Sequence, residues 1–574
     1  MSANKQRTAQ PDVWPTWPAP GVPVVVDDWR RQAREVAAAN AGAKSSLARS
    51  AAIIAVAFVL SRILGLLREI ILARMFGTSP EYSAYVSAFR IPDLLFLIIM
   101  AGSFGSAFIP VFAGLKASGR DHDAWRLASV VLNLSAIALA ASAAVAFLFA
   151  DPIVAYVVAP DATPDIQRIA TECMRILLLS PLFLGLGIAA KGILEGQDRF
   201  TLPAFAPVVY NVCTILGAIL LGPTLGVYGV AIGVVAGAVC HLLIQTPGLI
   251  ATRMRYSAVA DLRTEGVGQV GRLLAPRILG QAAFQINFIV VTNLAWRTGE
   301  QSVSALNYAW QLLMLPHGVL ALSISTVVFP TMARLFQAGD LPALRQTFGQ
   351  ALRPLLFLSV PAAIGLFFFR IAIIQTIFQS GAFSGQSTML VAAPLAWFAA
   401  GLVAYAAVEV LTRVFYAMHD TWTPVAAGVV TIGLNIALGL ALIDRFGFPA
   451  LAFSLSLSTA LEGAILFAVL GRRLGGLSRG SVRWLAKVLA AGAFMAVVAW
   501  FVAPRVTAAT APGTAPHLVQ LAIFIYALAV VGASYLLAAF VLKIPELRIA
   551  LGQVTRRVPA RLRRRHAAPE DGWR

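Results

Sequence analysis

Charged side chains inside apolar segments are the residues of this sequence that could do chemistry. Arg62, Arg68 and Glu69 stand within the first long apolar segment, Arg90 near the beginning of the second, and Arg277 near the beginning of the seventh. A charge at the middle of a bilayer costs about 2.5–3.5 kcal/mol, so a chain keeps it where it faces a protein-lined or water-filled cavity. Guanidinium groups stay charged and donate a planar fork of hydrogen bonds, which suits a diphosphate. The four arginines are therefore candidate ligands of such a group.

Each of these charges also has a simpler structural interpretation. An arginine near the end of a span often extends its head group to the membrane surface, and Arg90 and Arg277 stand near span ends. Glu69 has the alternative role of neutralising a neighbouring arginine. The sequence leaves both interpretations open for each residue.

Four further carboxylate or amide positions lie deep in later apolar segments. Glu409 and Arg413 are four residues apart, which is the spacing of an ion pair on one helix face. Glu462 has no partner that the sequence identifies, and a coupling-ion or proton site is one interpretation of it. Asn211 and Asn435 stand at similar places in the two halves of the chain, where hydrogen bonds between helices are the expected role.

The composition is typical of a membrane protein. Hydrophobic residues make up 59% of the 574 residues and charged residues only 12%, and the mean hydropathy is +0.79. The formal net charge of +19 resides mainly in loops and tails between apolar segments, so we do not expect nucleic acid as a partner. No phosphate-binding glycine loop, zinc-protease motif or CxxC pair is present, and we expect a transporter rather than an enzyme, without a metal or an organic cofactor.

The apolar pattern predicts an all-α polytopic membrane protein with about fourteen transmembrane helices. The second and eighth spans are long, and we expect them to bend near Pro92 and Pro316. The predicted spans are 51–76, 84–115, 125–150, 166–190, 203–222, 227–251, 271–295, 303–335, 350–379, 387–413, 425–443, 449–471, 483–503 and 517–542.

The distribution of basic residues predicts the orientation. Loops on one side of the predicted membrane are rich in Lys and Arg, and the loop at 151–165 on the other side carries three aspartates instead. Because basic loops stay in the cytoplasm, we expect both termini to be cytoplasmic. The basic loop residues are Lys116, Arg120, Arg126, Lys191, Arg199, Arg253, Arg255, Arg263, Arg272, Arg334, Arg345, Arg472, Arg473, Arg479 and Arg483.

The chain contains an internal repeat with an offset of about 215–220 residues. Arg62-Ile-Leu-Gly65 recurs as Arg277-Ile-Leu-Gly280, and the segment 87–115 resembles 308–335. Each repeat holds six spans, so we expect two six-helix lobes that share one orientation around a central cavity, plus two C-terminal helices. The predicted divisions are a disordered cytoplasmic tail at 1–48, an N-lobe at 49–255, a C-lobe at 256–475, the last two spans at 476–543 and a basic cytoplasmic tail at 544–574.

Six segments between about residue 45 and residue 475 resemble, in their order, the signature segments of the MurJ (MviN) lipid II flippases, which belong to the multidrug/oligosaccharidyl-lipid/polysaccharide exporter superfamily. These segments are SRILGLLREIILARMFG, AFRIPDLL, GSFGSAFIPVFA, ILEGQDRFTLPAFAPVVYN, FQSGAF and TRVFYAMHDTWTPV.

The resemblance implies that the chain lies in the bacterial inner membrane. There it moves the lipid-linked peptidoglycan precursor, lipid II, from the inner to the outer leaflet for cell-wall synthesis and cell shape. It implies alternating access that is driven by the membrane potential or a cation gradient in place of ATP. Arg62 and Arg68 match the two cavity arginines of the family in the first span, and Arg90 stands where a basic residue is common. The resemblance also implies a groove for the lipid tail at the last two spans, and other cell-wall synthesis proteins as partners.

The chain departs from the family pattern at charged positions. Phe96 stands where the family usually has an arginine. Ala101-Gly102 stands where the family has a Glu-Gly pair, and Trp310-Gln311 stands where it usually has Asp-Arg. Arg277 stands where a small residue is usual, so we expect it to supply part of the missing charge. Two alternatives therefore remain: a divergent paralogue that flips another polyprenyl-diphosphate glycan, and a non-transporting envelope scaffold. A multidrug exporter is disfavoured, because the charges inside the spans are mainly basic.

Overall fold

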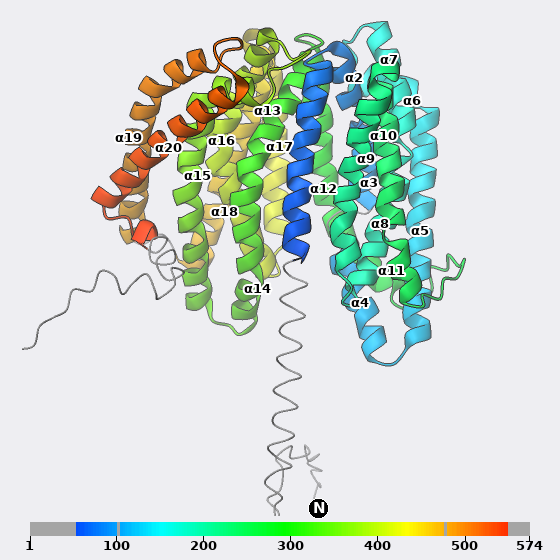
Figure 1. Ribbon diagram of the computed structural model, residues 1–574. Helices are drawn as coiled ribbons and strands as arrows, with labels where there is room; N and C mark the ends of the chain where they lie inside the picture. Colours follow the sequence, from blue (N-terminus) through cyan, green and yellow to red (C-terminus); the bar gives the residue numbers. More distant parts are fainter. Residues whose placement is uncertain (1–52, 100–103, 476–478, 549–574) are drawn as a thin grey trace, which may run out of the picture. The chain divides into compact units, whose positions relative to one another are not determined.

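The structure is a computed structural model that describes residues 53–99, 104–475 and 479–548 (Figure 1). The chain divides into two units, residues 1–56 and 57–574, and all contacts given below lie within the second. Within the described ranges the regular structure is helical, with no strand. The expectation of an all-α fold is therefore confirmed. The predicted tail at 1–48 and most of the basic tail at 544–574 lie outside the described residues.

Eleven helical segments among the described residues are long and apolar enough to cross a membrane. They are α5 (Asp121–Leu148), α7 with α8 (Pro164–Leu177 and Ser180–Glu195), α9 (Thr201–Leu225), α10 with α11 (Val227–Leu243 and Thr246–Ala251), α13 with η2 and α14 (Ser302–His317, Gly318–Leu322 and Ser323–Gln337), α15 (Leu341–Ile377), α16 (Gly385–Ala417), α17 (Trp422–Phe446), α18 (Pro449–Leu474), α19 (Arg479–Ala509) and α20 (His517–Val541).

The other three predicted spans are also helical. They are the helix over residues 53–76, the broken segment α2, α3 and α4 (Pro80–Ala88, Arg90–Ile99 and Phe104–Ala117), and α12 (Val267–Trp296). A short α6 (Ala150–Ile153) and a π-helical turn η1 (Val154–Val158) follow α5. Eleven and three make the fourteen predicted spans, and each predicted span has a helical counterpart.

Both predicted bends occur, and proline explains them. Proline has no backbone N–H, and its ring collides with the carbonyl group four residues earlier. That residue is Ala88 for Pro92, and α2 ends at Ala88. Pro316 lies in the last turn of α13, and the π-helical segment η2 begins two residues later, at Gly318. Pro92 thus separates α2 from α3 in the second span.

The helices of the second unit form two sets that α12 and the helical residues 57–76 connect. Helices α2–α11 pack mainly on one another, as do α13–α18, and the helical residues 57–76 run between these sets in Figure 1. Helix α12 packs against α3 of the first set and α17 of the second, while α19 and α20 pack against α15. Helix α12 therefore contacts both sets, and the predicted lobe boundaries at 49–255 and 256–475 stay a prediction.

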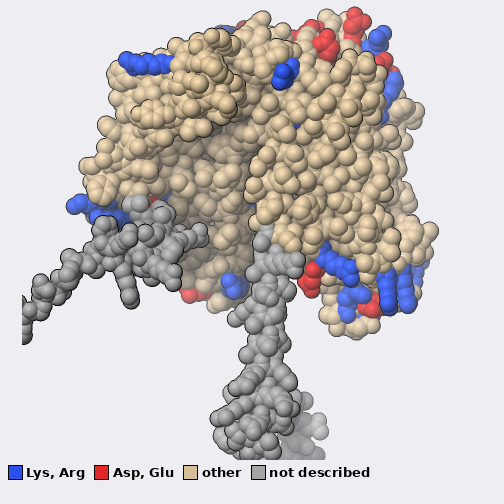
Figure 2. Space-filling view, viewed as in Figure 1, with Lys and Arg blue, Asp and Glu red and all other residues tan. Residues whose placement is uncertain are grey.

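Charged side chains gather at the two ends of the face shown in Figure 2 and leave an uncharged band between them, as a bilayer requires. At one end, Arg120 pairs with Glu265 at 2.6 Å and with Asp123 at 2.7 Å. Hydrogen bonds from Arg120 hold the pKa of Asp123 and of Glu265 below its usual value. These pairs join the beginning of α5 to the loop that precedes α12.

Candidate functional site

A cavity of about 240 Å³ lies between the two helix sets. The helix over 53–76 supplies most of its polar wall, and α9, α13 and the residue after α15 supply the rest. We call it the central cavity. The residues that line it are Ser61, Arg62, Gly65, Leu66, Arg68, Glu69, Asn211, Gln311, Leu312, Met314, Leu315 and Phe378.

Arg68 is held by a carboxylate and an amide. Its guanidinium donates to Glu69 Oε1 at 2.7 and 3.2 Å and to Asn211 Oδ1 at 3.3 Å. Asn211 also donates to the carbonyl oxygen of Pro207 at 3.0 Å, which fixes its orientation. Glu69 is 6% exposed and neutralises Arg68 of its own helix, so the simpler interpretation of Glu69 agrees with the geometry. The second carboxylate oxygen of Glu69 is buried and has no hydrogen-bond partner among the described residues.

Arg62 forms no ion pair or hydrogen bond with any residue that the structure describes, and only cation–π and van der Waals contacts hold it. Its guanidinium carbon lies 5.2 Å from the centroid of the Phe58 ring. On its other side is Gly318 of η2, where a Cβ atom would lie 3.6 Å from a terminal nitrogen of Arg62. Arg62 thus reaches from the first transmembrane helix to the second helix set with its hydrogen-bond donors available to a ligand.

Arg90 contacts α12 and does not line the central cavity as described. Its Nε donates to Thr292 Oγ1 at 2.8 Å, and its guanidinium carbon lies 5.5 Å from the centroid of the Phe288 ring. The predicted role of Arg90 as a cavity ligand would require it to leave these partners. Arg277 lies in α12, and its side chain is outside the described part of the structure.

The structure shows what surrounds three of the four residues that depart from the family pattern. Gln311 lines the cavity and donates to Glu69 Oε1 at 3.4 Å. Trp310 points away into an aromatic cluster, with its ring 5.4 Å from Phe288 and 5.6 Å from Tyr405. Phe96 packs against an apolar core, and Ala101 lies outside the described residues. The side chain of α13 that contacts Glu69 is therefore an uncharged amide.

The remaining candidates form local pairs away from the central cavity. Glu409 accepts from Arg413 at 3.0 Å, as the spacing of four residues predicts, and from Ser325 of α14 at 3.3 Å. Glu462 accepts from Thr431 of α17 at 3.4 Å, a partner that the sequence analysis did not identify.

The two asparagines join helices as predicted. Asn211 of α9 contacts Arg68, as described above, and Asn435 of α17 donates to Asn287 of α12 at 2.7 Å.

Aromatic rings close one end of the central cavity. Tyr308 stacks on Tyr82 at a centroid distance of 5.2 Å, and Tyr82 stacks on Phe76 at 6.1 Å. Tyr308 also contacts Phe378 at 5.3 Å and Phe383 at 5.5 Å. Phe378 lines the cavity, so this cluster separates the cavity from the protein surface at the end where residues 76–83 and 378–387 meet. We call this the closed end.

Polar contacts across the closed end join the two helix sets. Thr78 and Ser387 share a hydrogen bond of 2.9 Å, and Ala382 N donates to the carbonyl oxygen of Arg74 at 2.8 Å. Gly381 has a φ of +60°, and a Cβ atom there would overlap that carbonyl oxygen. No pattern in the sequence predicts these contacts. Gly381 and Ala382 do belong to the FQSGAF segment, which is one of the six signature segments.

Comparisons with known proteins agree with this architecture. The family model described as lipid II flippase MurJ matches residues 72–520. The lipid II flippase MurJ of Burkholderia cenocepacia is 32% identical over 436 residues, which cover 74% of this chain and 84% of that protein. The probable lipid II flippase MurJ of Haemophilus influenzae is 29% identical over 468 residues, which cover 78% of this chain and 91% of the relative.

Solved structures show the same fold. A structure of lipid II flippase MurJ in an inward closed conformation has a TM-score of 0.69 and 23% identity, and the match covers 84% of this chain and 98% of that one. An inward-facing multidrug resistance transporter of the MATE family has a TM-score of 0.62 and 16% identity, and the match covers 72% and 94%. From the family model and the Burkholderia relative together, we conclude that this chain belongs to the lipid II flippase MurJ family.

Proposed function

We propose that this chain is a transporter that flips lipid II from the inner to the outer leaflet of the bacterial inner membrane by alternating access. The observation that carries the proposal is the central cavity, which holds Arg62 and Arg68 between two helix sets and is closed at one end by the aromatic cluster. Family membership supports the same substrate. The basic loops support an orientation in which both termini are cytoplasmic and the closed end faces outward.

In this proposal the diphosphate of the substrate binds the cavity arginines. Arg62 has donors available, and each charge-assisted hydrogen bond would contribute about 1.5–3 kcal/mol. Arg68 is pre-oriented by Asn211 and would exchange part of its contact with Glu69 for the ligand. Arg90 would join the site from α3 only after it leaves Thr292 and Phe288 of α12, and Arg277 of α12 stays a proposed ligand. Coupling to the membrane potential or a cation gradient would supply the energy.

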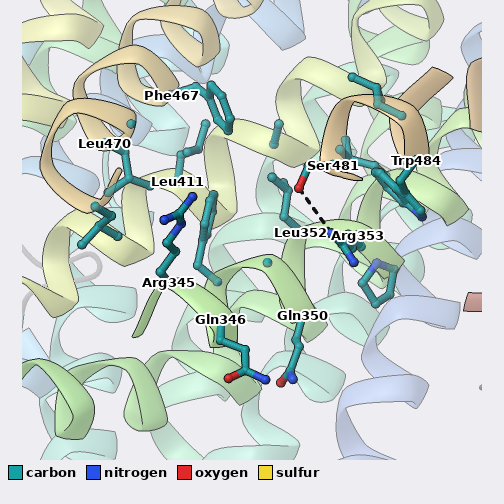
Figure 3. Close-up of a pocket in the computed structure, with 18 of the residues that line it drawn as sticks. Arg345, Gln346, Gln350, Leu352, Arg353, Leu411, Phe467, Leu470, Ser481 and Trp484 are labelled. Atoms are coloured by element: carbon teal, nitrogen blue, oxygen red, sulfur yellow. Dashed lines mark hydrogen bonds between the residues drawn. The ribbon is translucent and has the colours of Figure 1, made fainter. Parts of the chain in front are cut away.

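A second and larger pocket is our proposed site for the lipid tail. It has a volume of about 1220 Å³ and lies among α15, α16, α18 and the beginning of α19 (Figure 3). Leu352, Leu411 and Phe467 form part of a mostly apolar wall. At its rim, Arg353 donates to Ser481 at 3.2 Å and lies 5.7 Å from the ring centroid of Trp484. We propose that this pocket receives part of the polyprenyl chain while the head group is in the central cavity.

Two alternatives to lipid II flipping remain. Gln311 and Trp310 replace charged residues of the family pattern, and this observation favours a divergent member that moves a different polyprenyl-diphosphate glycan. The same loss of charge is compatible with a scaffold that recruits cell-wall synthesis proteins without transport. A scaffold would not depend on cavity arginines, so substitution of these residues separates it from a transporter.

Complementation tests the proposal. The resident lipid II flippase of a bacterium would be depleted, this chain expressed, and lipid II accessible at the outer face measured. We expect the wild-type chain to restore exposure, and Arg62→Ala or Arg68→Ala to abolish it. Arg505→Ala is the matched control, because Arg505 is exposed near the end of α19, outside the central cavity, and donates a hydrogen bond to the Phe501 carbonyl oxygen of its own helix.

Three outcomes separate the hypotheses. Full exposure in both cavity variants would contradict the proposed site. Exposure that persists in Arg277→Ala would remove Arg277 from it. No exposure by the wild-type chain, despite verified membrane insertion, would favour the other glycan or the scaffold.

A further inference from the structure

His317 occupies an unusual place in the second helix set. It is the last residue of α13, directly after Pro316 and directly before the π-helical segment η2. Single π-helical turns inside α-helices are rare and frequently lie at functional sites. The Nδ1 atom of His317 is buried and has no hydrogen-bond partner among the described residues. A histidine with one unsatisfied ring nitrogen retains a position for a proton.

The charged neighbours of His317 include a cavity arginine. Its ring is influenced by the charge of Glu409 of α16, by the backbone of Tyr405 and, more weakly, by the charge of Arg62 of the first transmembrane helix. The Arg62 guanidinium lies against Gly318, the next residue along the chain.

The carboxylate behind His317 is itself held in place. Glu409 accepts hydrogen bonds from Arg413 of its own helix and from Ser325 of α14. The two charged groups that act on His317 are therefore an arginine that lines the substrate cavity and a carboxylate that its own neighbours already neutralise in part.

This arrangement makes the proton affinity of His317 depend on the occupant of the cavity. While Arg62 has no anionic partner, its charge opposes a second positive charge on the adjacent ring. An anion bound to Arg62 removes that repulsion and attracts the imidazolium. By linkage, protonation of His317 must then strengthen anion binding by the same factor.

We propose that His317 is the coupling-proton site of this transporter. Nδ1 takes one proton from a hydronium ion when the diphosphate binds Arg62, so an N–H bond forms as an O–H bond breaks and water is left. The proton returns to water as hydronium when the diphosphate leaves. The imidazolium thereby supplies a positive charge on α13, the helix on which Trp310-Gln311 replaces the Asp-Arg of the family pattern. This inference rests on the proposed function, because it assumes an anionic substrate at Arg62.

The test is calorimetric titration of the purified full-length protein with farnesyl diphosphate, a short polyprenyl diphosphate. Titrations in buffers with different ionisation enthalpies, between about pH 6 and pH 8 around the ordinary histidine pKa of about 6.5, give the protons taken up per ligand. We expect affinity to rise about tenfold from the higher to the lower pH, with net proton uptake near neutrality. In His317→Gln and His317→Asn, affinity should keep its value at the higher pH but lose most of this rise.

The free diphosphate has the same protonation state at a given pH whichever protein is present. A difference in proton uptake between two variants therefore comes from the protein. His122→Gln is the matched control, because His122 is 78% exposed at its side chain, on α5, and it should leave the proton count unchanged. Equal proton uptake by the wild-type protein and both His317 variants would overturn the inference. The proposed function would still stand in that case if Arg62→Ala weakened binding. Binding that is unaffected by Arg62→Ala, or absent from the wild-type protein at every pH, would overturn both.

Discussion

The ion pair between Arg68 and Glu69 sets the charge of the central cavity. Glu69 accepts from Arg68 at 2.7 Å and from Gln311 at 3.4 Å, and it is almost fully buried. Breaking a buried pair by removing one partner leaves an uncompensated charge, which is costly for the folded protein. The same uncompensated charge would attract an anionic ligand. Glu69 is therefore expected to stabilise the folded protein and to weaken the binding of an anionic ligand.

Glu69→Gln should show both effects. The substitution keeps the shape of the side chain and frees the Arg68 guanidinium, so we expect about tenfold tighter binding of farnesyl diphosphate, equivalent to about 1.4 kcal/mol, together with a lower thermal unfolding temperature. Titration calorimetry and thermal unfolding measure the two effects. Glu172→Gln, in α7 and hydrogen-bonded to Tyr228, is the control for a lost carboxylate outside the cavity. Weaker binding in Glu69→Gln would show that Glu69 orients Arg68 rather than competing with the ligand.

Among the elements, the turn between α15 and α16 decides how the closed end forms. Gly381 and Gly513 both adopt positive φ, at +60° and +82°. A Cβ atom at Gly381 would overlap the Arg74 carbonyl oxygen, whereas nothing lies within 4 Å of one at Gly513. The two glycines share a conformational requirement and differ in their neighbours.

Gly381→Ala should therefore destabilise the protein more than Gly513→Ala. In both variants the left-handed backbone conformation of an alanine lowers the free energy of unfolding by about 1 kcal/mol. Only the first must also displace the contact between Ala382 and Arg74, which joins the two helix sets. Thermal unfolding of the two purified variants gives the comparison. Equal unfolding temperatures would mean that the turn moves away from Arg74 without cost.

For the whole molecule, the closed end is one state of a transporter that must open there. Several contacts cross it besides the aromatic cluster: Trp296 donates to Ser87 at 3.1 Å, Ser304 N donates to Ser83 at 3.2 Å, and Thr78 bonds Ser387 at 2.9 Å. These bonds are individually modest, of order 0.5–1.5 kcal/mol each. A set of modest bonds is suited to an interface that forms and breaks in each cycle.

A disulfide across this interface should stop transport. The Thr78 and Ser387 side chains approach within 2.9 Å, which suits the geometry of a disulfide. In Thr78→Cys/Ser387→Cys, with the three native cysteines replaced, oxidation should abolish lipid II exposure and reduction should restore it. Each single cysteine variant is the control. Undiminished exposure by the fully cross-linked protein would contradict alternating access at this end.

Hydrophobic length and the positions of basic residues were enough to predict fourteen spans, because burial of apolar segments in a bilayer is a local property of about twenty residues. Proline chemistry likewise predicted the bends near Pro92 and Pro316, and the four-residue spacing predicted the Glu409–Arg413 pair. The repeat and the signature segments identified the family and its arginines.

Only the tertiary structure decided which partners those charges have. Arg68 pairs with its own neighbour, Arg90 turns to Thr292 on α12, and Arg62 extends to Gly318, about 250 residues away in the chain. The aromatic closure and the surroundings of His317 arise in the same way, from helices that are distant in sequence. Spacing along one helix fixes which residues share a face, whereas contacts between helices depend on how the helices pack, and no local pattern encodes that packing.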